Sequence, residues 1–452
     1  MSEKRSSFTG KIGFVLAAAG SAVGLGNIWR FPYLAAKYGG GIFLLVYIAL
    51  SVTFGFSLMV AEIAIGRKTQ LSPIGAYRSL DKRFSFVGVL GALVPFVILP
   101  YYSVIGGWVI KYTVGFLAGE GGEMAESAYF GSFISGVGEP LLWFGVFVAA
   151  TALIVLCGVQ KGIEKVSKIM MPVLIALMLF IVIYTLATVE GAWEGVVYYV
   201  KPDLSHFSIM TVVAAMGQLF YSMSLAMGIM ITFGSYMKKD ISIEKSTHQI
   251  EIFDTGIAFL AGLMIVPACF AFSGGDPAAL GQGPSLMFGV LPKIFSNMPG
   301  GTVIGVVFFL MVLLAALTSS ISLMETVVST VQDKWRLDRR LCCLVVLAAS
   351  IALGIPSCLG YSLWSEVKLL GMQFLDLFDF ITNSIMMPIV ALATCVFIGY
   401  FLKPHAVIEE VSLSGEFKQK TLFSVMIRYI APACILLILA SSVLNAFGVI
   451  KI

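Results

Sequence analysis

Long apolar runs, each bounded by charged or Pro/Gly-rich stretches, constrain this 452-residue chain more than any other feature. A helix needs about 20 predominantly apolar residues to cross a bilayer, and only helices and closed barrels satisfy their own backbone in lipid. Apolar residues form 59% of the sequence and charged residues only 12%, whereas a soluble domain has about 45–50% and about 25%. We therefore predict an all-α integral membrane protein without a large soluble domain.

The distribution of positive charge orients the predicted helices. Eleven spans are predicted, at residues 11–37, 41–66, 84–118, 140–158, 163–187, 208–237, 250–272, 300–331, 340–355, 372–402 and 425–448. With the N-terminus in the cytoplasm, most of the 29 Lys and Arg residues fall on the inner side, as the positive-inside rule requires. The expected location is the cytoplasmic membrane, with the C-terminus outside because the number of spans is odd.

The remaining sequence indicates neither an enzyme nor a nucleic-acid-binding protein. The seven cysteines lack the spacing of a zinc site or a disulfide framework, and the three histidines lie between apolar runs. No organic cofactor and no nucleic acid partner is expected. The longest polar segments, near 119–139, 188–207, 273–299 and 403–424, are predicted to be loops. The run 13–19 resembles a signal peptide but continues without a polar spacer, so we expect it to be retained as the first span.

Two predicted helices are interrupted near their middle. Residues 20–27 read GSAVGLGN, and residues 217–228, five spans later, read GQLFYSMSLAMG. Glycine in a helix interior costs about 1 kcal/mol relative to alanine, and unpaired backbone in lipid costs more. Close helix packing is one explanation. The other is a pair of unwound segments that bind ions and substrate, which predicts an inverted repeat of residues 11–187 and 208–402, with 425–448 outside it.

A hydroxyl cluster lies within the eighth predicted helix, where Thr318, Ser319 and Ser320 follow each other. Such side chains commonly bond to carbonyls of their own helix, which is the simpler interpretation. If the cluster faces a broken helix, it supplies hard oxygen ligands of the kind that sodium prefers.

Together these segments resemble the neurotransmitter:sodium symporters, most closely the bacterial amino-acid transporters of that family. The resemblance rests on AAAGSAVGLGNIWRFPYLAAKYGGGIF in helix 1, GQLFYSMSLAMG in helix 6 and ALTSSIS in helix 8, and it covers nearly the whole chain. It implies one transporter domain over 1–452 with a LeuT-type fold, in which helices 1 and 6 are unwound at the midplane. It also implies sodium-coupled uptake by alternating access, by a monomer or dimer surrounded by membrane lipid.

The resemblance implies two sodium sites. The second site would consist of Gly20, Val23, Ala315, Thr318 and Ser319. The first would consist of Ala22, Asn27, Ser222 and Asp254, together with the substrate carboxylate. Aligning helix 7 through Ala261 and Gly262 favours Asp254, whereas a shift of one residue brings Phe253. Glu62 is expected near the first site.

The substrate site implied by the resemblance binds an amino acid. Its lining would be Ala22, Gly24, Leu25, Gly26, Ile98, Tyr102, Tyr221, Ser222, Ser224, Met227, Ser319 and Leu323. Members that carry amines have an acid where this chain has Gly24, so Gly24 leaves space for the carboxylate of a neutral, hydrophobic amino acid. Asp254 and Glu62 are acids that can stand in for chloride, so transport is expected to be chloride-independent.

Two charged gates complete the resemblance. On the outside, Arg30 would pair with Asp379, with Asp376 one turn earlier; on the inside, Arg5 would pair with Asp333. Phe8 stands where the family usually has tryptophan. A channel is the alternative class, but it needs a continuous lined pore. A membrane enzyme is a third class, and the scarcity of histidines and paired intramembrane acids disfavours it.

Overall fold

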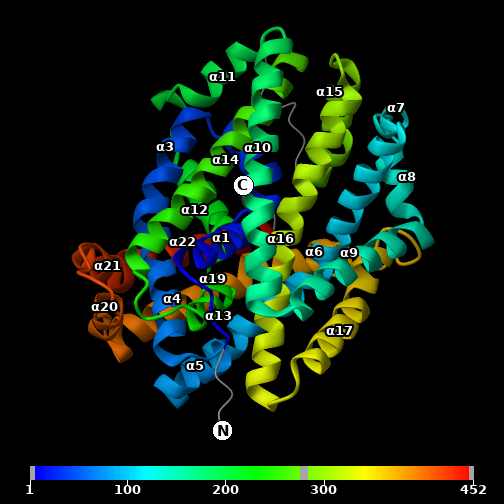
Figure 1. The fold of residues 1–452 in the computed structure, drawn as a ribbon. Helices are drawn as coiled ribbons and strands as arrows, with labels where there is room; N and C mark the ends of the chain where they lie inside the picture. Colours follow the sequence, from blue (N-terminus) through cyan, green and yellow to red (C-terminus); the bar gives the residue numbers. More distant parts are fainter. Residues whose placement is uncertain (1–5, 275–282, 447–452) are drawn as a thin grey trace.

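The structure is a computed structural model of the chain that describes residues 6–274 and 283–446 (Figure 1). Within these ranges it is helical and contains no strand. Nine described helices are long and apolar enough to cross a bilayer, and the bent pair Lys11–Ala22 and Gly26–Lys37 makes a tenth span. The predicted all-helical membrane fold is confirmed. The predicted count of eleven is not, because the sixth span is divided into two pieces that are each shorter than a bilayer requires.

The helices that build the membrane domain are α1 (Lys11–Ala22), α2 (Phe31–Lys37), α3 (Gly41–Leu50), α4 (Phe56–Thr69), α6 (Ser85–Ala118), α9 (Gly138–Leu156), α10 (Lys165–Thr188), α12 (Ile209–Ser222), α13 (Ile229–Ser235), α14 (Ile243–Phe272), α16 (Gly301–Trp335), α17 (Arg339–Leu359), α18 (Phe374–Asp379), α19 (Met387–Val396), α21 (Lys420–Val425) and α22 (Ala431–Ala446). Single wide helical turns join α3 to α4, α18 to α19 and α21 to α22, so each of these pairs forms one span.

The polar segments predicted to be loops contain short helices instead. These are α7 (Gly121–Met124), α8 (Tyr129–Ser135), α11 (Ala192–Val200), α15 (Leu291–Asn297) and α20 (Pro404–Ser412). They were missed because segments this short carry too few residues for a clear hydrophobic period. Figure 1 shows α7, α11 and α15 at one end of the bundle, and α5 (Pro73–Leu80) and the N-terminus at the other.

Helix α16 runs through the bundle and packs against α6, α10 and the broken first span. Its middle carries the hydroxyl cluster predicted from the sequence, and Thr318, Ser319 and Ser320 are all buried. The buried middle of α16 therefore faces protein and not lipid.

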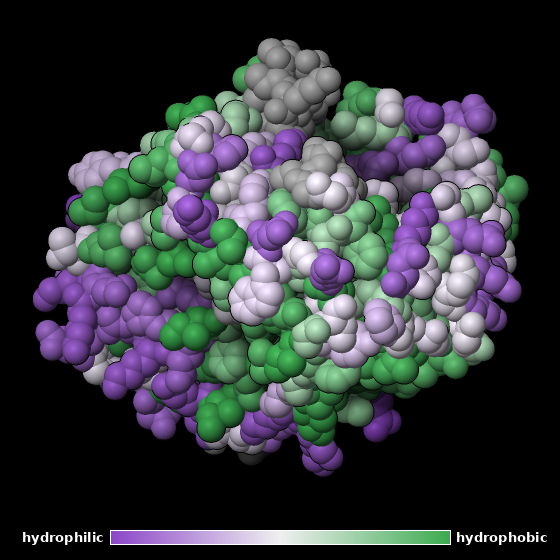
Figure 2. Space-filling view, turned by 90° about the horizontal axis from the view of Figure 1, so that it is seen from above, coloured by the Kyte–Doolittle hydropathy of each residue, from purple (hydrophilic) through white to green (hydrophobic). Residues whose placement is uncertain are grey.

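Figure 2 looks onto the end that carries α11 and α15, where hydrophilic and hydrophobic residues are intermixed.

The first span breaks within its glycine-rich segment. Helix α1 ends at Ala22, and Val23 is extended, with φ −76° and ψ 101°. Helical backbone resumes at Gly26, and the two pieces meet at 56°. The glycine cluster therefore marks an opened backbone in the middle of the bundle.

The sixth span breaks between Ser222 and Ile229. Three residues there have left-handed backbone: Ser224 (φ 52°), Ala226 (φ 60°) and Gly228 (φ 68°). For a non-glycine residue that conformation costs roughly 1–2 kcal/mol, so contacts with surrounding residues must stabilise it. One such contact is the Ala226 N–H, which donates to Oε1 of Glu62 at 2.7 Å.

Candidate functional site

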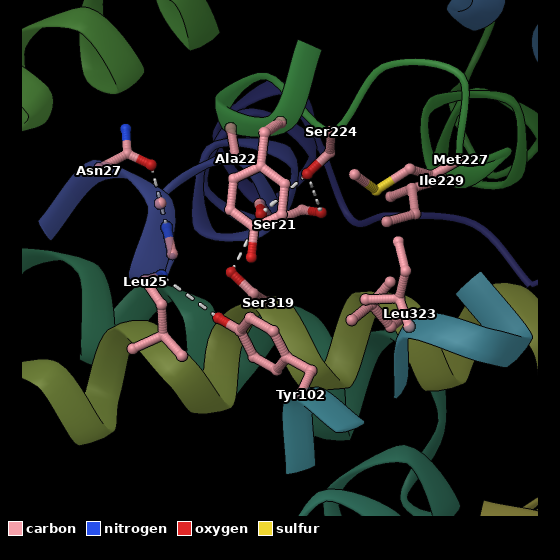
Figure 3. A pocket seen from close by; sticks show the side chains of 14 residues that line it. Ser21, Ala22, Leu25, Asn27, Tyr102, Ser224, Met227, Ile229, Ser319 and Leu323 are labelled. Carbon is pink, nitrogen blue, oxygen red and sulfur yellow. Dashed lines mark hydrogen bonds between the residues drawn. The ribbon is translucent and has the colours of Figure 1, made fainter. Parts of the chain in front are cut away.

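A cavity lies where the two breaks face α6 and α16 (Figure 3). It is lined by Ser21, Ala22, Gly24, Leu25, Gly26, Asn27, Ile98, Tyr102, Tyr221, Ser224, Met227, Ile229, Ser319 and Leu323. Every residue that the sequence suggested for the substrate site is in this set except Ser222. Ser21, Asn27 and Ile229 are additional lining residues that sequence reasoning did not assign to it.

One end of the cavity is polar. The hydroxyl of Tyr102 accepts from the main-chain N–H of Leu25 at 3.3 Å. Ser319 Oγ lies 3.1 Å from both the Ser21 and the Val23 carbonyl oxygens, and Ser224 Oγ donates to the Ser21 carbonyl at 3.0 Å. Figure 3 shows these hydroxyls converging on the break in the first span. This end therefore offers hydroxyls, carbonyls and amides to an ionic group.

At this polar end the atoms around Gly24 leave no room for a side chain. A Cβ atom at position 24 would lie 2.7 Å from Ser319 Oγ and 3.0 Å from the Tyr102 hydroxyl oxygen. Both distances are shorter than van der Waals contact allows, so a side chain at this position would push the two hydroxyls apart. The close approach of these two hydroxyls to the backbone therefore requires glycine at position 24.

The other end of the cavity is apolar. Ile98 comes from α6, Leu323 from α16, and Met227 and Ile229 from the second break and the start of α13. All four side chains are buried. An unbranched thioether adapts its shape readily, so Met227 lets this end fit side chains of different size.

Asp254 lies at the centre of a neutral cluster beside the cavity. Its Oδ1 accepts from Ser222 Oγ at 2.7 Å and from Asn27 Nδ2 at 2.8 Å, and its Oδ2 accepts from the Tyr47 hydroxyl at 3.2 Å. Asp254 is fully buried in α14. A buried carboxylate surrounded by neutral groups is costly unless a cation joins it.

The cluster and the substrate cavity contain different residues of the predicted sites. Ser222 belongs to it and not to the substrate cavity, while Phe253, the alternative in the helix 7 alignment, lies on a half-buried face next to it. Tyr47 was not predicted to belong to this cluster, because a lone tyrosine in an apolar run does not indicate which residue its hydroxyl bonds to. Glu62 contacts the second break by accepting from the Ala226 N–H.

The residues suggested for a second sodium site meet where α1 contacts α16. A Cβ at Gly20 would lie 3.3 Å from Cβ of Thr318, and Ser319 Oγ donates to the Val23 carbonyl. Thr318 Oγ1 donates to the Ala315 carbonyl at 3.0 Å. Ser319 thus bonds to the first span, whereas the Thr318 hydroxyl bonds to carbonyls of its own helix, as the simpler interpretation expects.

A second, larger cavity borders Tyr221 and is lined by Arg30, Asp376 and Asp379 among others. The Asp379 carboxylate accepts from Asn383 at 2.6 Å and from the Tyr101 hydroxyl at 3.2 Å. The Arg30 guanidinium lies 5.9 Å from the centroid of the Tyr221 ring. Between the described residues Arg30 and Asp379 there is no ion pair within 4 Å, so the structure places them in one cavity without pairing them.

Near the N-terminus, aromatic rings pack against each other. Phe8 is fully buried and contacts the rings of Phe14, Phe233 and Tyr236 edge to face, with centroids 5.7–6.1 Å away. Arg5 lies outside the described residues, so the predicted pair with Asp333 does too. Asp333 Oδ2 accepts from the Ser72 N–H at 2.7 Å.

Beside these rings, a buried acid joins three elements. Glu325 accepts from the Tyr236 hydroxyl at 2.7 Å and from Arg339 at 2.5 Å. Arg339 also donates to the Val155 carbonyl at 2.7 Å. This network, which sequence reasoning did not identify, ties α13, α16 and α17 to the end of α9.

Two broken helices that meet at a polar-to-apolar cavity are typical of the binding site of secondary transporters. The profile of the Sodium:neurotransmitter symporter family matches residues 5–120 and 129–449. The chain belongs to the sodium:neurotransmitter symporter family, and the resemblance seen in the sequence is confirmed.

Similar proteins agree with this assignment. The chain is 36% identical to the sodium-dependent transporter YhdH of Bacillus subtilis over 100% of both chains. It is 32% identical to a sodium-dependent transporter of Haemophilus influenzae, over 97% of this chain and 98% of the other. The crystal structure of MhsT in complex with L-phenylalanine matches with a TM-score of 0.86 and 36% identity, and covers 97% of this chain and 100% of MhsT. The fold is of the LeuT type, and the family is sodium-dependent.

Proposed function

We propose that this protein is a sodium-coupled symporter that takes up a neutral, hydrophobic amino acid across the cytoplasmic membrane by alternating access. The observation that carries the proposal is the cavity between the two breaks, polar beside Gly24 and apolar beside Met227. An amino acid has the same division between an ionic end and a side chain. The similar transporter MhsT is seen in complex with L-phenylalanine, which supports a hydrophobic substrate.

In this proposal the polar end holds the substrate backbone. The Tyr102 hydroxyl and the amides at Leu25 and Gly26 donate to the carboxylate, which occupies the space beside Gly24. Carbonyls at Ala22, Tyr221 and Ser224 accept from the ammonium group. Charge-assisted hydrogen bonds of this kind are roughly twice as strong as neutral ones. In this proposal the site therefore recognises both the carboxylate and the ammonium group of an amino acid.

The proposed first sodium ion lies between Asp254, Ser222, Asn27 and the Ala22 carbonyl, next to the substrate carboxylate. In the present structure the amide nitrogen of Asn27 points at Asp254. A cation there requires the amide oxygen of Asn27, so binding turns this side chain over. The ion then compensates the buried negative charge of Asp254. The Asp254 carboxylate in this way serves as the anion that chloride would otherwise supply.

The proposed second ion is held by Gly20, Val23, Ala315, Thr318 and Ser319. Each sodium ion contributes about 1.4 kcal/mol from a tenfold gradient and about 2.3 kcal/mol from 100 mV. Two ions thus supply about 7 kcal/mol, which supports roughly 10⁵-fold accumulation. Coupling requires that ions and substrate bind together, and Ser319 connects them because it lines the cavity and contacts Val23.

Two features support alternating access. The larger cavity shares Tyr221 with the substrate cavity, and Phe8, near the N-terminus, is fully buried. We propose that residues 11–187 and 208–402 are the inverted repeats that move against each other, with the N-terminus in the cytoplasm. Pairs such as Arg30 and Asp379 would form in one state and separate in the other, which biases the equilibrium between the states.

A stability screen of the purified protein tests this function. Each of the twenty amino acids is added in sodium and, in parallel, in potassium buffer, and the unfolding temperature is measured. A ligand at 100 times its Kd stabilises by about 2.7 kcal/mol. We expect hydrophobic amino acids to stabilise the protein in sodium alone. Equal stabilisation in both buffers, or none by any amino acid, contradicts the proposal.

A further inference from the structure

A cluster of exposed cations and aromatic rings lies where α6 begins and the span containing α19 ends. The turn Lys82–Phe84 leads into α6, and the last turn of the other span is Phe397–Leu402. Phe84 is buried between them, with ring centroids 4.8 Å from Phe397 and 4.6 Å from Phe401. The two span ends are therefore fixed against each other, and their outer side chains form one surface.

The cations of this surface are exposed to an approaching anion. Lys82 and Lys403 are exposed, and Arg83 is 72% exposed with its guanidinium 5.3 Å from the centroid of the Phe401 ring. Arg83 donates to Asp81 through Nε and Nη2, which holds the pKa of Asp81 below its usual value. Asp81 therefore stays charged and fixes Arg83 in position, and the Nη1 group is left for another acceptor.

Apolar side chains continue from these cations toward the middle of the membrane. Phe86 is 50% and Phe401 48% exposed, and Val89 and Leu93 are exposed on the following turns of α6. In a spanning helix such residues contact acyl chains. Cations at the end of a span followed by apolar side chains along it match the division of a phospholipid into headgroup and tail.

We propose that this surface, formed by Lys82, Arg83, Phe86, Phe401 and Lys403, is a binding site for an anionic phospholipid of the cytoplasmic leaflet. The phosphate and headgroup lie against Arg83, Lys82 and Lys403, and an acyl chain lies along Phe86 and Val89. The assignment to the cytoplasmic leaflet rests on the proposed function, in which the N-terminus lies in the cytoplasm. The site lies outside the transport pathway, so it would hold the ends of α6 and α19 together through the lipid.

The test uses the full-length protein in nanodiscs of phosphatidylcholine with or without one quarter phosphatidylglycerol. Retained phosphatidylglycerol is counted by native mass spectrometry after detergent release. A surface cation contributes about 5-fold in affinity for anionic lipid, so Lys82→Gln with Arg83→Gln is expected to reduce retention by roughly 10- to 30-fold. Phe401→Ala is expected to reduce it as well, while both variants still bind amino acid in sodium.

The matched control is Lys161→Gln with Lys165→Gln, which removes two exposed cations from the same side of the membrane. It is expected to retain phosphatidylglycerol like the wild type. Glycerol 3-phosphate is added as a competitor, and it is not expected to displace the lipid. Equal loss in the control, equal retention of phosphatidylcholine, or displacement by glycerol 3-phosphate would overturn the proposal. Reduced lipid retention in the variants, together with a wild type that binds no amino acid in sodium, would instead count against the proposed transport function and not against the lipid site.

Discussion

The side-chain amide of Asn27 donates to Oδ1 of Asp254 at 2.8 Å, so the break in the first span touches the middle of α14. Both residues are fully buried. In the proposed first sodium site the ion takes the place of this hydrogen bond, and the two helices then share the ion.

Replacing Asp254 with asparagine should therefore weaken sodium binding. The variant removes the fixed negative charge that balances the ion, and we expect the sodium concentration needed for half-maximal uptake to rise by at least 10-fold. Chloride added to the variant should restore part of the affinity, because a mobile anion can take the place of the carboxylate. Sodium titration of uptake in gluconate and in chloride measures both effects. An unchanged sodium dependence would place Asp254 away from the ion.

Gly24→Ala should abolish amino-acid binding while the protein still folds. The new Cβ falls 2.7 Å from Ser319 Oγ and fills the space assigned to the carboxylate. The control is Gly145→Ala in α9, where a Cβ meets nothing within 4 Å. Sodium-dependent binding of labelled amino acid should be lost only in the first variant. Wild-type affinity in Gly24→Ala would show that the carboxylate lies elsewhere.

Tyr102→Phe should lower amino-acid affinity by about 10- to 100-fold, because a charge-assisted hydrogen bond contributes about 1.5–3 kcal/mol. Tyr400→Phe is the control, since that exposed hydroxyl bonds to the Arg428 carbonyl away from the site. Isothermal titration in sodium gives both affinities. The decarboxylated amine of the same substrate should bind wild type much more weakly than the amino acid; equal binding would mean that the carboxylate is not recognised.

Thr318→Ala with Ser319→Ala should abolish sodium-driven accumulation. The two hydroxyls are the side-chain ligands of the proposed second ion, and backbone carbonyls alone leave it under-coordinated. Ser350→Ala, which removes a hydroxyl that bonds within α17, serves as the control. Accumulation is measured at fixed sodium gradient together with the unfolding temperature. Undiminished accumulation by the double variant would rule out this ion site.

The sequence was sufficient to locate both breaks, because glycine and small polar residues in the middle of an apolar run have few structural explanations. Gly20, Gly24 and Gly26 surround the first break, and Ser222 to Gly228 contain the second. The exact path of the second break was not predictable. It depends on left-handed backbone at Ser224 and Ala226, and neither residue type favours that conformation.

That path explains why Ile229 was missed as a lining residue. Its direction is set by the turn at Gly228, and in the sequence it is one aliphatic residue among many. Ser21 was also missed as a lining residue, because the resemblance assigns roles to its neighbours Gly20 and Ala22 and none to Ser21. The larger cavity and the Glu325–Arg339 pair join residues from separate spans. Such contacts follow from packing, which the order of residues along the chain does not reveal.

The most direct test of sodium-coupled symport is uptake into proteoliposomes with an inward sodium gradient, an interior-negative potential and gluconate as the only anion. The substrate is the amino acid that stabilises the protein most in the screen. The account predicts that its internal concentration rises far above the external one and that replacing sodium with potassium stops this uptake. Uptake that is equal in potassium, or that stops when internal and external concentrations are equal, would contradict it.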